Sequence, residues 1–237
     1  MRLLKKLARN VCRKILDNYG EKDAGRLSIY FSEFNDYNGF IASNLPDLKP
    51  AYQKYLDEVS TVDMALSFET SQLLYALAKI KKAKRILDLG SGFSSYVMRL
   101  YAKNSGNDVT VYSIDDDKGW LEKTKIFLDA MQVSTEHILE WNDFKKEAPT
   151  GFDLISHDLG GLEIRAESLP FVLSLMDKSG IIVLDDMHKA RGGLISGYRA
   201  VAIKEVKKSG MLLLSARKYT LDTINRFCEI AFNPSKL

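Results

Sequence analysis

The sequence has little of several residue types, and each scarcity excludes a class of protein. Only two of the 237 residues are cysteines, Cys12 and Cys228, which is too few for a disulfide framework and favours a reducing compartment. No apolar run approaches the roughly 18 residues that span a bilayer, and no segment is a convincing secretory signal. With 5 prolines, 15 glycines and 46% hydrophobic residues, the chain is neither collagen-like nor disordered. We therefore expect a cytoplasmic protein with a substantial core.

Basic charge is concentrated at the start of the sequence. Residues 1–22 carry seven basic and two acidic side chains, a net charge of +5, whereas the remaining 27 basic and 29 acidic residues give −2. The body of the protein is therefore not a basic nucleic-acid surface, and we expect no nucleic-acid partner. Residues 3–16 have the apolar spacing of an amphipathic helix. Such a helix could lie peripherally on the inner membrane surface, or pack against the domain or a second subunit in a homo-oligomer.

The apolar pattern divides the chain into two parts. Residues 1–66 are predicted to form a helical extension, in which an aromatic-rich stretch over 20–60 that includes Tyr55 consists of short helices and loops. This stretch could cap a binding site, or its aromatics could simply pack the extension against the domain. Over 67–237, short apolar strands alternate with helices, which predicts a Rossmann-like α/β domain whose mostly parallel sheet is covered on both faces. Only about ten residues join the last two strands, so we expect an antiparallel hairpin there.

The predicted elements of this domain follow from apolar runs and capping residues. Strands are expected over 85–89, 109–114, 137–141, 152–157, 181–184, 211–216 and 226–232. Helices are expected over 67–82, 94–103, 118–131, 163–176 and 195–208, the first of them capped by Ser67.

A glycine-rich turn follows the first predicted strand. The sequence Asp88-Leu89-Gly90-Ser91-Gly92-Phe93-Ser94-Ser95 joins this strand to a helix. Glycines let the backbone turn tightly and approach a ligand at the carboxyl edge of the sheet, and the helix N-terminus favours a negative group such as a carboxylate. Ser95 stands where a dinucleotide fingerprint has its third glycine, which counts against NAD. The candidate cofactor-binding residues here are Asp88, Gly90, Gly92 and Ser94.

Acidic residues also end the next two strands. Asp115 is well placed to accept hydrogen bonds from ribose hydroxyls. Alternatively, Asp116 or Asp117 only caps the following helix. Asn142 and Asp143 follow the third strand, where an amide or carboxylate could read an adenine edge.

Together these motifs resemble class I S-adenosylmethionine-dependent methyltransferases over residues 67–232. The resemblance implies a seven-stranded sheet of order 3-2-1-4-5-7-6 with strand 7 antiparallel. It implies that Gly90 and Gly92 pass close to S-adenosylmethionine and that Asp115 holds the ribose. Asp143, with Asn142 beside it, would then lie by the adenine.

A second segment carries a narrower resemblance. The run Ser67-Phe68-Glu69-Thr70-Ser71-Gln72 is similar to the helix that precedes the glycine motif in caffeoyl-coenzyme A O-methyltransferases. This similarity implies that Glu69 or Thr70 borders the cofactor.

Three carboxylates are expected to meet at the ends of the fourth and fifth strands. Asp158 follows the fourth strand, and Asp185 and Asp186 follow the fifth. Adjacent parallel strands would bring them together, where they repel one another unless a cation or protons compensate. Carboxylate oxygens suit Mg²⁺, and a metal bound to a hydroxyl lowers its pKa and orients it. Alternatively, the Asp-Asp pair only caps a loop.

This acidic pattern resembles the divalent-metal sites of catechol-type and macrocin-type sugar O-methyltransferases. The resemblance implies that Asp158, Asp185 and Asp186 are metal ligands and that Asp158 takes part in catalysis. Catechol-type enzymes carry a basic lysine three residues after the fourth-strand acid, but Gly161 stands there in this sequence.

A histidine is the candidate general base in place of that lysine. His188 lies two residues past Asp186, and imidazole titrates near neutral pH. His157 is the second choice, because it precedes Asp158 on the strand and could point to the other side. Either histidine could instead be a hydrogen-bonded structural residue. The segment 189–193 looks basic and loop-like; it could close over an anionic substrate or simply be solvated.

The leading hypothesis is methyl transfer from S-adenosylmethionine to an oxygen of a small molecule or sugar, assisted by Mg²⁺. A metal-free methyltransferase with His188 as base is the first alternative. A nucleic-acid N-methyltransferase is disfavoured, because no Asn/Asp-Pro-Pro-Tyr/Phe segment follows the fourth strand. Two further alternatives are a non-catalytic S-adenosylmethionine-binding module and a different nucleotide-binding domain.

Overall fold

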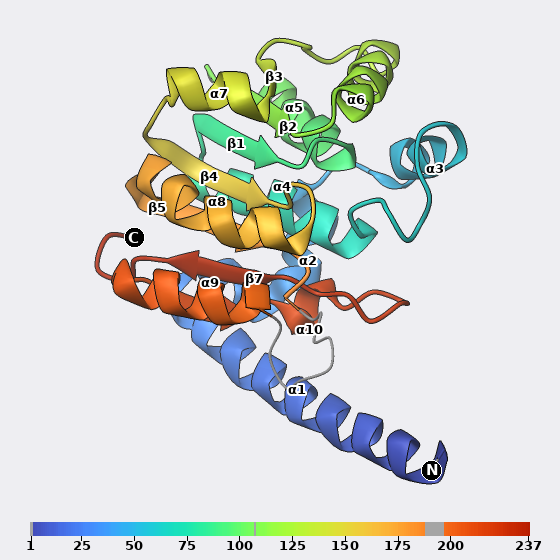
Figure 1. Ribbon diagram of the computed structural model, residues 1–237, viewed down its shortest axis with the longest axis vertical. Coiled ribbons are helices and arrows are strands. Elements are labelled where there is room, and N and C mark those ends of the chain that lie inside the picture. Colours follow the sequence, from blue (N-terminus) through green and yellow to red (C-terminus); the bar gives the residue numbers. More distant parts are fainter. Residues whose placement is uncertain (1, 107, 188–196) are drawn as a thin grey trace.

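A seven-stranded sheet forms the centre of the protein (Figure 1). The structure is a computed structural model that describes residues 2–106, 108–187 and 197–237, with side chains from Lys14 onward. Strands β1 to β5 are parallel where they pair, and β7 is antiparallel to both β5 and β6. The order β3-β2-β1-β4-β5-β7-β6 and the terminal antiparallel hairpin are those predicted from the sequence.

The strands and helices alternate as the apolar pattern indicates. The strands are β1 (Arg85–Leu89), β2 (Thr110–Asp115), β3 (Ile138–Glu140), β4 (Phe152–His157), β5 (Met176–Leu184), β6 (Leu212–Ser215) and β7 (Glu229–Phe232). The domain's helices are α4 (Phe68–Lys81), α5 (Phe93–Ser105), α6 (Lys118–Ala130), α7 (Trp141–Glu147), α8 (Leu162–Leu175), α9 (Gly197–Lys208) and α10 (Arg217–Thr220). The extension contains α1 (Arg2–Tyr30), the 3₁₀ helix η1 (Ser32–Asp36), α2 (Tyr37–Asn44) and α3 (Lys49–Glu58).

The sheet buries a different set of side chains on each face, because successive strand residues point in opposite directions. In β5, Ile181 and Val183 join a core shared with α4, α5 and the extension. Ile182 and Leu184 join a second core, in which α8 and α9 contribute Leu169, Val172 and Ala202 among others. The nearly continuous apolar run of this strand is what a sheet covered on both faces requires.

Several elements differ from the sequence prediction, among them the short helix α10 between the last two strands, where no helix was expected. The first helix does not end near residue 16 but continues to Tyr30, because the domain packs against its second half. Strand β5 begins at Met176 rather than at residue 181, and its first residues pair with β4 across a register shift that the apolar pattern does not signal. The third strand ends at Glu140 rather than at residue 141, and Asn142 and Asp143 lie on helix α7, which was not predicted.

The second half of α1 is joined to the hairpin end of the sheet by polar and apolar contacts. Asp23 accepts a hydrogen bond from the Ser215 backbone at 2.9 Å, and Asp17 pairs with Arg217 at 2.8 Å. Leu27 is fully buried in the core on this face. The first half of α1 projects away from the sheet in Figure 1. Its contact with a membrane or a second subunit stays a prediction.

The described helices give no indication of a membrane span. Across residues 2–106, 108–187 and 197–237, no helix combines the length and apolar character that crossing a bilayer needs.

Truncating Leu27 tests whether the extension belongs to the folded core. We expect Leu27→Ala to lower the free energy of unfolding by about 2–5 kcal/mol, the usual cost of deleting a buried leucine side chain. Ile29→Ala on the same helix is the control, because Ile29 is 77% exposed; its effect should stay within about 0.5 kcal/mol. Urea unfolding of both variants measures the difference. Equal losses of unfolding free energy in the two variants would contradict the burial of Leu27 in the core.

Candidate functional site

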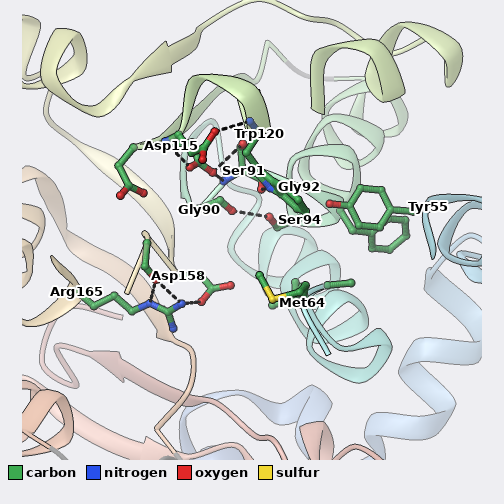
Figure 2. A pocket seen from close by; sticks show the side chains of 16 residues that line it. Tyr55, Met64, Gly90, Ser91, Gly92, Ser94, Asp115, Trp120, Asp158 and Arg165 are labelled. Carbon is green, nitrogen blue, oxygen red and sulfur yellow. Dashed lines mark hydrogen bonds and ion pairs between the residues drawn. The ribbon is translucent and has the colours of Figure 1, made fainter. Parts of the chain in front are cut away.

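A cavity of about 340 Å³ lies at the carboxyl ends of β1, β2 and β4 (Figure 2). Ligands of open α/β sheets bind at this edge, and the volume lies within the range of small-molecule sites. The cavity is bordered by the glycine turn, the acidic end of β2, the start of α6 and the end of β4, together with residues from the extension. Its lining residues are Tyr55, Met64, Ala65, Leu66, Gly90, Ser91, Gly92, Phe93, Ser94, Asp115, Asp116, Asp117, Trp120, Asp158, Gly160 and Arg165.

The glycine turn forms one side of this cavity, and its two glycines are there for different reasons. Gly90 has φ +89°, and a Cβ at this position would overlap the carbonyl oxygen of Asp158. A Cβ at Gly92 would lie 2.9 Å from the Tyr55 hydroxyl. Any larger residue would therefore push the turn away from β4 or from the extension. Ser94, one residue into α5, lines the cavity beside them.

Asp88 supports the turn from beneath and does not line the cavity. Its carboxylate is fully buried and accepts hydrogen bonds from Ser95 at 2.5 Å and from Ser113 at 3.1 Å. Ser95 in turn accepts a hydrogen bond from the Gly92 backbone, so Asp88 holds the glycine turn indirectly, through the Ser95 hydroxyl. Burial raises the pKa of Asp88 to about 6, although these hydroxyls and Arg99 oppose the shift. The direct cofactor contact predicted for Asp88 is therefore replaced by a supporting role.

Asp115 is buried at the end of β2 and binds the glycine turn. One of its oxygens accepts from the Ser91 backbone at 2.7 Å and from the Ser91 hydroxyl at 3.0 Å, and the other accepts from the Asp117 backbone at 3.0 Å. Burial raises its pKa, although those hydrogen bonds oppose the shift. Asp116 is exposed and lines the cavity. Asp117 caps α6, as one of the sequence alternatives had it.

Trp120 forms a further wall of the cavity. It lies in the first turn of α6, where its backbone is capped by Asp117. Its indole N–H donates to the Ser91 carbonyl at 2.5 Å, which fixes the ring beside the glycine turn. The ring therefore offers an apolar face next to a strongly acidic strand end.

Three predicted cofactor residues lie away from this wall. Asn142 and Asp143 are exposed on α7, and Asp143 pairs with Lys146 at 2.6 Å. That partner lowers the pKa of Asp143. Glu69 lies in the first turn of α4, and neither it nor the buried Thr70 lines the cavity. The structure thus gives no support for an adenine contact from α7 or a cofactor contact from Glu69.

The three predicted metal-site carboxylates do come together. Asp158 follows β4 while Asp185 and Asp186 follow β5, and the register pairs His157 with Leu184 at the ends of these strands. One oxygen from each carboxylate lies within 4.8 Å of the others. Asp186 adopts φ +56°, a left-handed conformation that aspartate tolerates better than most residues. Burial and the neighbouring Asp186 raise the pKa of Asp185, and Arg165 opposes this shift.

A guanidinium group lies among these carboxylates. Arg165, in the first turn of α8, contacts Asp158 at 2.5 Å (Figure 2). It also contacts Asp186 at 2.9 Å. Burial opposes its charge, but Asp158 and Asp186 raise its pKa above the ordinary value. The donor set is that of a hard-cation site, but a cationic side chain already bridges two of its members. As folded, the cluster therefore does not fit a divalent metal.

His157 is a core residue and does not face the cavity. It is fully buried, with its ring nitrogens 3.1 Å from the hydroxyls of Tyr198 and Ser168. Burial, with Arg165 nearby, lowers its pKa to about 3, so the ring is neutral at physiological pH. Because the ring is buried and does not line the cavity, the geometry gives no support for His157 as the general base. His188, the first choice, and the segment 189–193 lie outside the described residues.

Solved structures match the chain in fold. TomG from Streptomyces achromogenes, an O-methyltransferase in complex with S-adenosylmethionine, is 18% identical and matches over 80% of this chain and 91% of its own, at a TM-score of 0.59. A methyltransferase from Podospora anserina with bound S-adenosylhomocysteine is 14% identical over 84% and 94%, at a TM-score of 0.60. The chain has the Rossmann-like methyltransferase fold. No protein-family model and no curated protein sequence matches it.

In this methyltransferase fold, two residues that shape the cavity were not singled out from the sequence. Arg165 lies seven residues after Asp158, and the short loop before α8 brings the first turn of that helix back to the same sheet edge. This spacing was a usable signal. Trp120 follows the acidic end of β2 and could have been found in the same way. Tyr55 belongs to the aromatic stretch that was expected either to cap a binding site or to pack the extension, and it lines the cavity beside Gly92.

The raised pKa of Asp88 predicts a pH-dependent stability. A carboxyl whose pKa is higher in the folded state stabilises that state below the unfolded-state pKa and loses this effect as the pH rises through about 6. We expect the wild type to lose about 2 kcal/mol between pH 4 and pH 7 relative to Asp88→Asn. Urea unfolding at both pH values measures this difference. A difference that does not change with pH would contradict the buried, titrating carboxyl.

Proposed function

We propose that this protein transfers a methyl group from S-adenosylmethionine to a hydroxyl oxygen of a small molecule or sugar. The observation that carries the proposal is an acidic, glycine-edged cavity at the ligand-binding edge of a methyltransferase fold. O-methyltransferases are among the solved structures that match this fold, TomG and one from Bacillus cereus among them. The second of these is 12% identical, over 82% of this chain and 94% of its own, at a TM-score of 0.58.

The charge of the cavity favours this cofactor over a dinucleotide. Its lining includes the carboxylates of Asp115, Asp116, Asp117 and Asp158 against the single guanidinium of Arg165. S-adenosylmethionine carries a sulfonium and an ammonium, both of which an acidic wall attracts, whereas the pyrophosphate of NAD would be repelled. Ser95 in place of a third glycine agrees with this preference.

Different lining residues can bind different parts of the cofactor. Gly90 and Gly92 leave backbone room for the methionine part, and the N-terminus of α5 favours its carboxylate. Asp116 is exposed at the end of β2 and can accept from ribose hydroxyls, while Asp115 is already bonded to Ser91. The indole of Trp120 offers an apolar face for the adenine ring.

The chemistry asks little of the protein beyond alignment and proton removal. When bound, S-adenosylmethionine supplies the methyl group on a sulfonium leaving group. The acceptor oxygen must be held in line with that methyl group and must lose its proton. Asp158 is placed to orient the acceptor hydroxyl, because it lines the cavity and is itself held by Arg165. The role of His188 as the base stays a prediction.

A non-catalytic S-adenosylmethionine-binding module is the main alternative. Such a module would need the glycine turn and the acidic end of β2 but not the base. His188→Ala separates the two functions. A catalyst should lose turnover and keep its affinity for S-adenosylhomocysteine, whereas a binding module has no turnover to lose. Transfer of labelled methyl to a panel of vicinal diols and sugars provides the activity measurement.

Cofactor binding tests the proposal most directly. We expect calorimetry to show S-adenosylhomocysteine binding to the wild type, with Gly90→Ala at least about tenfold weaker because its Cβ would displace the turn from Asp158. Gly161→Ala is the matched control, since a Cβ at Gly161 meets nothing within 4 Å. NAD should not bind. Binding of NAD in preference to S-adenosylhomocysteine would overturn the proposal.

A second pair of variants tests which element faces the adenine. Trp120→Ala removes the ring that lines the cavity, and we expect a loss of affinity for S-adenosylhomocysteine of about tenfold or more. Asp143→Ala removes an exposed side chain on α7 and should change that affinity by less than about twofold. Calorimetric titration of both variants gives the comparison. A larger loss of affinity in Asp143→Ala than in Trp120→Ala would instead favour the adenine contact predicted for α7.

A further inference from the structure

We infer that the guanidinium of Arg165, rather than a divalent cation, is the resident counter-charge of the acidic cluster formed by Asp158, Asp185 and Asp186, so that this protein works without a bound metal ion. The donor set alone predicts a hard-cation site. A fourth side chain changes this prediction: Arg165, on the helix α8 that follows Asp158.

The contacts of Arg165 show that it takes the bridging position that a metal would need. Its two terminal nitrogens contact different carboxylates, Asp158 at 2.5 Å and Asp186 at 2.9 Å. A divalent cation would bind oxygens of the same carboxylates, at about 2.0–2.1 Å for Mg²⁺. The guanidinium and the metal would then lie within a few ångströms of each other, with like charges and shared ligands. Only one of them can hold the cluster.

Arg165 is also held in place independently of the carboxylates. Its Nε lies 3.3 Å from the Leu159 carbonyl and 3.2 Å from that of Gly160, and Nη2 donates to Gly160 at 2.9 Å. The side chain is only 9% exposed. These backbone acceptors are in the loop between β4 and α8, which also carries Asp158. Displacing the guanidinium would strand buried acceptors as well as separate two ion pairs, so an incoming metal meets a filled site.

The arrangement assigns Arg165 the role of a positioning residue. A metal would come and go with its concentration, whereas a side chain keeps Asp158 and Asp186 paired and Asp158 oriented at all times. Since Asp158 and Arg165 both line the cavity, this fixed pair is presented to the substrate. The role of this pair toward a substrate rests on the proposed methyl transfer. The inference that Arg165 replaces a metal ion does not.

Manganese binding tests the inference on the full-length chain. The free Mn²⁺ signal in electron paramagnetic resonance reports bound metal directly, with or without S-adenosylhomocysteine. We expect the wild type to show no site at the cluster with a Kd below about 1 mM. We expect Arg165→Met to gain one Mn²⁺ per chain, and Arg165→Met with Asp186→Asn to lose it again. A wild-type site of one Mn²⁺ per chain that Asp186→Asn abolishes would overturn the inference.

Thermal unfolding keeps the test decisive if Arg165→Met fails to fold. The wild type should melt at the same temperature in EDTA and in millimolar Mg²⁺, and Asp186→Asn should behave alike in both. A stabilisation by Mg²⁺ that is present in the wild type and missing in Asp186→Asn would overturn the inference. Binding of S-adenosylhomocysteine to the same samples reports on the proposed function separately. A wild type that binds neither ligand would support the inference and contradict the methyltransferase proposal.

Discussion

The close approach of the Gly90 backbone to the carbonyl group of Asp158 is the constraint on which the cavity depends. The two central strands β1 and β4 pair up to this point, and there is no room between them for a side chain on the turn. The turn therefore lies close to the end of β4, while its Gly90 N–H donates to the Ile114 carbonyl of β2 at 2.8 Å. Three consequences follow at the same edge of the sheet: the turn lies open to a ligand, α5 begins beside it, and Asp158 stands where it can face that ligand.

The supports of the turn form a layered set of hydrogen bonds. Asp88 lies behind it and acts through Ser95, while Asp115 lies beside it and binds Ser91 directly. Trp120 then binds the Ser91 carbonyl from α6. Each support belongs to a different element, so the turn is held only when the sheet and both helices are assembled. This explains why Asp88 and Asp115, which look like ligand contacts in the sequence, are engaged by the chain itself.

In the acidic cluster, a residue from a neighbouring helix changes the chemistry that the three carboxylates alone would predict. Parallel pairing of β4 and β5 makes the meeting of Asp158, Asp185 and Asp186 predictable from the sequence, and the structure confirms it. Their chemistry was not predictable, because it depends on the cation nearest to them. The loop after Asp158 is short and α8 begins at Leu162, so Arg165 returns to the strand end and satisfies two of the acids. A few residues more in that loop would leave the same three acids without this partner.

The alternation of strands and helices could be predicted from the sequence, because periodicity and capping act over short distances along the chain. The order of the sheet came from the family resemblance. The edge at which the functional side chains gather followed from the expected parallel pairing of the strands. Tertiary structure alone decided which of those side chains face the cavity. It turned His157 into the core between Tyr198 and Ser168, carried Asn142 and Asp143 away on α7, and brought Tyr55 beside Gly92. The directions of these side chains depend on packing between distant segments, and no local pattern in the sequence encodes that packing.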